Sequence, residues 1–361
     1  MALATLLLIV LVRNPFIVAL AAAAPAFFVF GDSSVDTGNN NFISTLIKAN
    51  SLPYGMNFDP PGATGRFSNG KLVSDYIAEF LDLPYPVNFL DPGVSPWNLL
   101  KGVNFAAAGA GLLDSTGFSR GVRSFTKQIK EFQKVVKVLE SLAGKSSTLD
   151  LLSRSIFLIS FAGNDLAANY QLNPFRQMFY NLTQFESLLI NQMSRSIQTL
   201  HAYGAQKFII ADIPPLGCTP VELILHGACK GRCVASVNEQ IRSFNSKTSV
   251  FFSKLRAVLR DCDFLHLKSY TIVQRILENP STHGLRHASR ACCGNGGHYN
   301  ALGPCNWFIS SVCEDPDLYA FWDMVHPTQA LYKLVANEVI FGSPNSIYPF
   351  NLAHLVSNMP Q

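Results

Sequence analysis

The chain has 361 residues, of which 48% are hydrophobic and 14% are charged, so it can supply a large buried core. Its 28 basic and 24 acidic residues are spread along the chain and leave a formal net charge of +4. This charge is too small and too evenly spread to indicate a nucleic-acid-binding protein. No linker, charged block or internal repeat divides the sequence, and we therefore expect residues 25–361 to form one domain.

The first 24 residues are expected to be a signal peptide. Leu6–Val12 and Phe16–Ala24 are apolar runs, and the second ends in alanines that suit a small-residue cleavage site. Met1–Thr5 has no basic residue, and Arg13-Asn14-Pro15 interrupts the apolar stretch. An uncleaved anchor and a buried helix are the alternative interpretations. Because neither run is long enough to span a bilayer, the pattern favours secretion, with no membrane insertion after cleavage.

Predicted strands and helices alternate along the rest of the chain. The runs typical of buried strands are Ala26–Phe30, Val103–Ala107, Ser155–Phe161, Lys207–Ala211 and Phe264–Leu267. Helical periodicity lies between and after them, over residues 72–81, 122–139, 176–203 and 235–259. This alternation predicts an α/β fold in which helices cover both faces of a parallel sheet.

Three candidate site residues follow the ends of three different predicted strands. They are Ser33, Gly109 and Asn164. Because sites in open α/β sheets form beyond the carboxyl ends of the strands, we expect the three residues to share one rim. Ser33 ends the motif Gly31-Asp32-Ser33, where an apolar run breaks into a turn that can present a hydroxyl. Helix capping is the alternative role for this serine.

A serine hydroxyl becomes a nucleophile when an adjacent base takes its proton. His326 is the candidate base, because Asp323 precedes it by three residues and can fix its tautomer. Helix capping or a surface charge is the alternative role for Asp323. Pro327 is expected in the first turn of a following helix, which would place His326 on the loop that enters it. The Gly109 amide and the Asn164 side chain can donate to a developing oxyanion, so the set predicts a serine hydrolase.

A second serine stands in a motif that resembles a nucleophile elbow. The segment Gly117-Phe118-Ser119-Arg120-Gly121 matches G-x-S-x-G, which requires a buried strand running directly into it. Residues 112–116 are too few and too polar to form that strand. We therefore do not expect Ser119 to be catalytic.

All eight cysteines lie after residue 200, and an even number in an exported chain predicts disulfides there. Spacing leaves their pairing open. The close pairs Cys229/Cys233 and Cys292/Cys293 raise zinc as an alternative, which the lack of a matching histidine spacing disfavours. Asn181 begins the triplet Asn181-Leu182-Thr183 and is the expected glycosylation site.

Taken together, these motifs resemble the plant-type GDSL esterase/lipases of the SGNH hydrolase superfamily. The likeness covers nearly the whole chain after the signal and extends to residues 64–70, 214–220 and 291–294. It implies a flavodoxin-like three-layer α/β/α fold. It also implies roles for five residues: Ser33 as nucleophile and amide donor, Asp323 and His326 as its triad partners, and Gly109 and Asn164 as oxyanion donors. One departure is Ala162, which stands where the family usually has glycine.

The expected reaction is hydrolysis of a carboxylic ester through an acyl-enzyme, with no metal or organic cofactor. Transfer of the acyl group to another alcohol is one alternative, and a non-catalytic secreted binding glycoprotein on the same fold is another. The resemblance implies an extracellular or cell-wall setting. It leaves open whether the ester is an acyl lipid, a polyester or an acylated polysaccharide, and the sequence contains no signal of oligomeric state.

Overall fold

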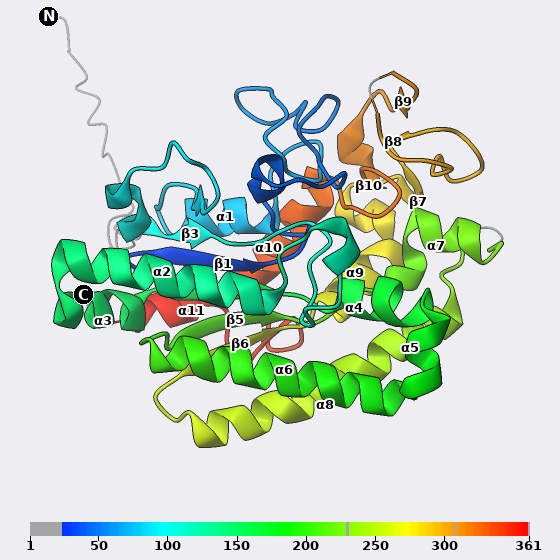
Figure 1. Ribbon diagram of the computed structural model, residues 1–361. Coiled ribbons are helices and arrows are strands. Elements are labelled where there is room, and N and C mark those ends of the chain that lie inside the picture. Colours follow the sequence, from blue (N-terminus) through cyan, green and yellow to red (C-terminus); the bar gives the residue numbers. More distant parts are fainter. Residues whose placement is uncertain (1–23, 229–230, 307, 360–361) are drawn as a thin grey trace, which may run out of the picture.

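The computed structural model describes residues 24–359 except 229, 230 and 307, so all but the last residue of the predicted signal peptide lies outside the described part. A seven-stranded sheet with the order β11-β6-β5-β4-β1-β3-β2 forms the middle layer (Figure 1). Its strands are β1 (Phe27–Gly31), β2 (Val87–Asn88), β3 (Val103–Asn104), β4 (Ile156–Ser160), β5 (Lys207–Ala211), β6 (Asp263–Leu267) and β11 (Ile347–Tyr348). All neighbouring strands are parallel except β11, which pairs antiparallel with β6. The order β3-β1-β4-β5-β6 is the flavodoxin-like one.

The five predicted strands are confirmed, although one is shorter than expected. Of the predicted strand over residues 103–107, only Val103–Asn104 forms a regular strand, which is β3. The chain nevertheless continues beside β1 after this point. Phe105 N donates to Val29 O at 2.8 Å, and Ala107 N donates to Gly31 O at 3.0 Å. These bonds lead the backbone to Gly109 at the carboxyl end of β1.

Helices cover both faces of the sheet, which confirms the three-layer arrangement (Figure 1). One layer contains α2 (Phe125–Ala143), α6 (Leu182–Ala202) and α8 (Ala235–Val258), and the other contains α1 (Val73–Phe80), α9 (Ser269–Glu278), α10 (Gln329–Phe341) and α11 (Leu352–Ser357). Shorter helices are α3 (Lys145–Arg154), α4 (Gly163–Leu166), α5 (Pro174–Phe179) and α7 (Pro220–Leu225). The described part contains no helix long and apolar enough to cross a bilayer.

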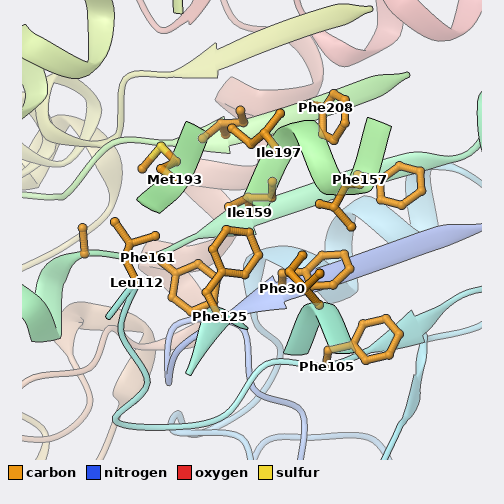
Figure 2. Packing of buried hydrophobic residues seen from close by; sticks show 14 of the residues in the cluster. Phe30, Phe105, Leu112, Phe125, Phe157, Ile159, Phe161, Met193, Ile197 and Phe208 are labelled. Atoms are coloured by element: carbon orange, nitrogen blue, oxygen red, sulfur yellow. The ribbon is translucent and has the colours of Figure 1, made fainter. Parts of the chain in front are cut away.

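Successive side chains of β1 point alternately into two hydrophobic cores, one on each face of the sheet. Phe28 and Phe30 face the α2 side, whereas Phe27 and Val29 face the α10 side. Figure 2 shows the first of these cores, where aromatic rings from the strands and α2 pack together. Phe30 stacks on Phe105 with ring centroids 4.9 Å apart. This double-sided burial explains why the strands are continuous apolar runs.

The prediction of one continuous helix over residues 176–203 is wrong, because two helices form there. Helix α5 ends at Phe179, and α6 begins only at Leu182. Asn181 is the N-cap of α6: its Oδ1 accepts from Gln184 N at 2.9 Å, and the Gln184 side chain accepts from Asn181 N at 3.0 Å. This reciprocal cap starts a new helix where hydrophobic spacing alone would continue the old one.

Disulfides close the C-terminal part, as the cysteine pattern predicts. The pairs are Cys218–Cys233, Cys292–Cys313 and Cys293–Cys305. Cys262 is a free thiol, and Cys229 lies outside the described residues. The alternative zinc site is contradicted, because the sulfurs of Cys233, Cys292 and Cys293 are already bonded to other cysteines.

The two adjacent disulfides hold the strands that precede the candidate catalytic loop. The elements here are β7 (His287–Ala291), β8 (Cys293–Gly294), β9 (Ser311–Val312) and β10 (Tyr319–Phe321). Cys292 N donates to Phe321 O at 3.0 Å, and Cys293 N donates to Trp322 O at 2.7 Å. The stapled segment therefore fixes the backbone just before Asp323.

Candidate active site

Ser33 lies in a tight turn immediately after β1. Val35 N and Asp36 N donate to Asp32 O at 3.2 and 3.0 Å, and Ser34 N donates to Asp32 Oδ1 at 2.9 Å. No helix begins here, so Ser33 is not a helix cap. The turn needs glycine at position 31, where an added Cβ would lie 2.3 Å from Val35 Cγ2 and 2.8 Å from Ser160 O.

The three candidate triad residues are joined by hydrogen bonds. His326 Nε2 lies 2.9 Å from Ser33 Oγ, although the two residues are 293 positions apart. On the other side of the ring, His326 Nδ1 lies 2.9 and 2.8 Å from the two carboxylate oxygens of Asp323. This is the order of contacts in a nucleophile–base–carboxylate triad.

Asp323 is a buried carboxylate held in its ionised form. Burial alone would raise the pKa of Asp323, but the charge and hydrogen bonds of His326 outweigh it. The backbone amides of Val325 and His326 also donate to Oδ1, at 2.8 and 2.7 Å. The net result is a pKa below the ordinary value of 3.8, so Asp323 accepts from the imidazole throughout the neutral range.

The loop carrying His326 folds back on β10. Trp322 N donates to His326 O at 2.7 Å, and Ser68 Oγ donates to Pro327 O at 3.0 Å. The prediction that Pro327 lies in the first turn of the helix is wrong. Thr328 is the N-cap of α10, with its Oγ1 accepting from Leu331 N at 3.3 Å, so Pro327 precedes the cap.

Sequence reasoning misses Tyr54, which also contacts the triad. Its hydroxyl donates to Asp323 Oδ2 at 2.8 Å from a buried position. Burial, and then the charge of Asp323, raise the pKa of Tyr54 well above its ordinary value, so the phenol stays protonated and remains a donor. Tyr54 comes from an irregular segment without periodicity or a recognisable motif, and its contact is therefore invisible in the sequence.

Of the candidate oxyanion donors, Asn164 lies beside Ser33 and His326, whereas Gly109 lies in a neighbouring loop. Asn164 is in the first turn of α4 and lines a cavity together with Ser33 and His326. Its Nδ2 donates to Ala110 O at 2.9 Å, which connects α4 to the loop after β3. Gly109 does not line that cavity; it lies in the loop that Asn164 contacts.

The amides on either side of Gly109 are both hydrogen-bonded. Ala108 N donates to Asp36 Oδ2 at 2.9 Å, and Ala110 N donates to Ala107 O at 3.0 Å. Among the described residues, neither the Gly109 amide nor the Ser33 amide has a hydrogen-bond partner. Gly109 also has a φ of +82°, a backbone conformation that favours glycine.

Asp165 fixes this loop to α4. Its carboxylate accepts from Leu112 N at 2.7 Å, Leu113 N at 3.2 Å and Thr116 Oγ1 at 2.5 Å. Burial raises its pKa to about 6, against the hydrogen bonds that oppose this shift. The residue after Asn164 thus has a positioning role.

Ala162, where the chain departs from the family pattern, precedes α4 in a turn. Ala162 has a φ of +88°, the left-handed conformation that glycine adopts most easily. That conformation costs an L-residue about 1–2 kcal/mol. The structure therefore holds Ala162 in a strained backbone conformation directly before α4.

In the described part of the chain, no hydrogen bond joins the serine of the elbow-like motif to Ser33, Asp323 or His326. Ser119 lies in an exposed 3-10 turn, Phe118–Arg120, and no strand leads into it. A nucleophile elbow requires that strand. The structure therefore agrees with excluding Ser119.

Comparison with known proteins assigns the chain to a family. The family model described as GDSL-like lipase/acylhydrolase matches residues 27–339. The chain is 38% identical to GDSL esterase/lipase 7 of Arabidopsis thaliana, over 92% of each protein. It is 34% identical to GDSL esterase/lipase LTL1, over 91% of this chain and 90% of the relative, and 34% identical to GDSL esterase/lipase APG, over 90% and 92%. Both of these relatives are also from Arabidopsis thaliana. This chain therefore belongs to the GDSL lipase/acylhydrolase family and is a carboxylic ester hydrolase.

Proposed function

We propose that this hydrolase is a secreted serine esterase that cleaves lipid or cell-wall acyl esters through an acyl-enzyme on Ser33. The observation that carries the proposal is the 2.9 Å contact between Ser33 Oγ and His326 Nε2, with Asp323 on the opposite ring nitrogen. His326 can take a proton from Ser33 only through Nε2, and Asp323 keeps the proton on Nδ1.

In the first step, Ser33 Oγ attacks the ester carbonyl carbon while His326 Nε2 takes the hydroxyl proton. The carbonyl oxygen becomes an oxyanion, for which the amides of Ser33 and Gly109 and the side chain of Asn164 are the proposed donors. The C–O bond to the alcohol then breaks, and His326 returns its proton to the departing oxygen. Water repeats the sequence on the acyl-enzyme and releases the acid.

Secretion is supported by the sequence and by the cysteine chemistry. The N-terminal apolar segment fits a signal peptide, and disulfides such as Cys292–Cys313 form in oxidising compartments. Asn181 is exposed, and its cap contact uses Oδ1, which leaves Nδ2 available for a glycan. We therefore propose that Asn181 is glycosylated and that the protein acts outside the cell or in the cell wall.

The experiment is hydrolysis of p-nitrophenyl esters, from acetate to palmitate, by the secreted protein. Ser33→Ala is expected to abolish turnover, while Ser119→Ala serves as the matched control and keeps wild-type rates. Addition of a second alcohol, with product analysis, separates hydrolysis from acyl transfer. If the folded wild-type protein cleaves no ester in the series, the proposal of a general esterase is wrong and the non-catalytic alternative returns.

A further inference from the structure

A cavity of about 530 Å³ lies at the carboxyl ends of β5 and β6, away from Ser33. Its walls come mainly from α8 of one helical layer and α9 of the other, and we call it the α8–α9 cavity. Among the described residues, only Asp212 lines both this cavity and the one beside Ser33. The volume is in the ordinary range of small-molecule sites, about 300–1,000 Å³, so the α8–α9 cavity is a separate candidate binding site.

Two cationic side chains of the α8–α9 cavity have no carboxylate partner among the described residues. Arg242 on α8 is exposed, and its Nη1 donates to the Tyr270 hydroxyl at 2.8 Å. Lys268 immediately precedes α9, and its Nζ donates to Pro344 O at 3.0 Å. A hydroxyl and a carbonyl do not neutralise a positive charge, so both cations are free to attract an anion.

The other charged side chains of this cavity leave that excess in place. Arg275 forms an ion pair with Glu338 of α10. Glu278 lies at the far end of α9, where its carboxylate accepts from Gln274 Nε2 at 2.7 Å. Positive charge therefore predominates toward the start of α9.

The buried acid and the buried base of the cavity are both uncharged near pH 6. Burial raises the pKa of Asp212 to about 8, against the Tyr270 amide and the charge of Lys268, so the carboxyl group stays protonated. Burial, followed by the charges of Lys268 and Arg256, lowers the pKa of His266 to about 4, so the imidazole stays neutral. The inner end of the cavity therefore brings no negative charge that would repel an anion.

The rest of the lining offers hydrogen-bonding groups. The hydroxyls of Ser246, Ser249 and Thr271 line the cavity, and in the described part of the chain their side chains have no hydrogen-bond partner. His266 Nε2 is buried and also has no partner there, which favours a polar occupant over a hydrocarbon. Thr271 is in the first turn of α9, whose helix dipole has its positive end at this side. Together these groups suit a ligand that carries both negative charge and hydroxyls.

We propose that the α8–α9 cavity binds a small hydroxylated anion, a sugar acid or a sugar phosphate, whose oxyanion is held by Arg242 and Lys268. The guanidinium can donate two hydrogen bonds to one carboxylate or phosphate group, and the ammonium adds a point charge. The hydroxyls of the ligand bond to Ser246, Ser249 and Thr271. This binding is independent of the acyl-enzyme mechanism.

The test compares matched ligands by isothermal titration calorimetry at pH 6. Glucuronic acid, glucose-6-phosphate, glucose and inorganic phosphate are titrated into the full-length protein. We expect an acidic sugar to bind about 10-fold or more tightly than glucose, since hydrogen bonds between charged groups are the strong ones. The tighter of the two acidic sugars identifies the oxyanion as a carboxylate or a phosphate. Inorganic phosphate that binds as tightly as the acidic sugars would contradict the role of the hydroxyls.

Variants then locate the bound anion. Arg242→Gln and Lys268→Gln are each expected to weaken binding of the acidic sugar about 10-fold. Ser246→Trp places a large ring in the cavity from an exposed position of α8 and should abolish binding. The matched control is Lys254→Gln, which removes an exposed cation of α8 that does not line the cavity and should keep wild-type affinity.

The outcome does not depend on the esterase mechanism. Ser33→Ala is expected to bind the acidic sugar like wild type, so failure of the proposed catalysis leaves this result intact. Equal affinities of wild type, Arg242→Gln and Ser246→Trp would overturn the proposal. So would the absence of binding of both acidic sugars at millimolar concentration. If Ser246→Trp does not fold, the two charge variants and Lys254→Gln decide the result.

Discussion

Tyr54 donates a hydrogen bond of 2.8 Å to Asp323 Oδ2, across 269 positions of the chain. Asp323 thus accepts from a phenol, from the imidazole of His326 and from two backbone amides. The phenol holds the carboxylate beside the imidazole and takes up part of its negative charge. Tyr54 is therefore a positioning residue that acts through Asp323.

Replacing Tyr54 by phenylalanine tests this role. Without this hydrogen bond the carboxylate holds the imidazole less firmly in place, so kcat is expected to fall about 10-fold with KM nearly unchanged. The acid limb of the kcat/KM profile should move to higher pH, because more of the carboxylate charge then faces the imidazolium. Tyr85→Phe is the control, since it removes a tyrosine–carboxylate contact with Glu79 at the surface. An unchanged pH profile would assign Tyr54 a purely structural role.

Asn164 is expected to stabilise the transition state more than the bound substrate. Asn164→Ala should lower kcat about 100- to 1000-fold, as removal of an oxyanion donor typically does, with little change in KM. Asn169→Ala is the comparison, because it removes a buried asparagine of the same segment that bonds Ser115 and Thr116 instead. A rise in KM at constant kcat would show that Asn164 binds the ground state and is not an oxyanion donor.

The disulfide Cys292–Cys313 should stabilise the fold, since it closes a loop in the segment that supports Phe321. Replacing both cysteines by serine is expected to lower the free energy of unfolding by about 3 kcal/mol. Denaturant unfolding under oxidising conditions measures the change. Cys262→Ser, which alters the free thiol, should stay within about 1 kcal/mol of wild type. Equal stability of the two variants would contradict a structural role for this bridge.

Asp212 makes stability depend on pH. Its pKa rises from 3.8 to about 8 in the fold because of burial, so between these values the folded state keeps a proton that the unfolded state has released. Stability contributed by this group is therefore lost as pH rises from about 4 to about 8. Burial lowers the pKa of the neighbouring His266 to about 4, so the 3.9 Å Asp212–His266 contact joins two neutral groups near pH 6.

Asp212→Asn removes this titration and can keep the acceptor for Tyr270 N. The melting temperature of the variant is expected to exceed that of wild type at pH 8–9 and to differ less near pH 5. Asp261→Asn is the control, because the His201 contact lowers the pKa of Asp261. Its replacement should therefore not raise the melting temperature at pH 8–9. Parallel curves for Asp212→Asn and wild type would contradict the buried titration.

Local patterns in the sequence predict much of this structure. The strands are buried on both faces and carry strong apolar runs, and the rule that sites form at strand ends brings Ser33 and Asn164 to one rim. Asp323 and His326 are three residues apart, so their contact is local. Contacts between distant segments leave no such signal, which is why Tyr54, the disulfide pairing and the cavity emerge only from the fold. The break before α6 is missed because a polar cap at Asn181 outweighs hydrophobic periodicity.

The central claim is that Ser33 is the nucleophile activated by His326, and covalent labelling tests it most directly. The folded protein is treated with a fluorophosphonate probe, and the modified peptide is identified by mass spectrometry. We expect one label, on Ser33, that is lost in Ser33→Ala and strongly slowed in His326→Ala, while Ser119→Ala labels like wild type. Labelling of another serine, or no labelling of Ser33 in folded protein, would contradict the account.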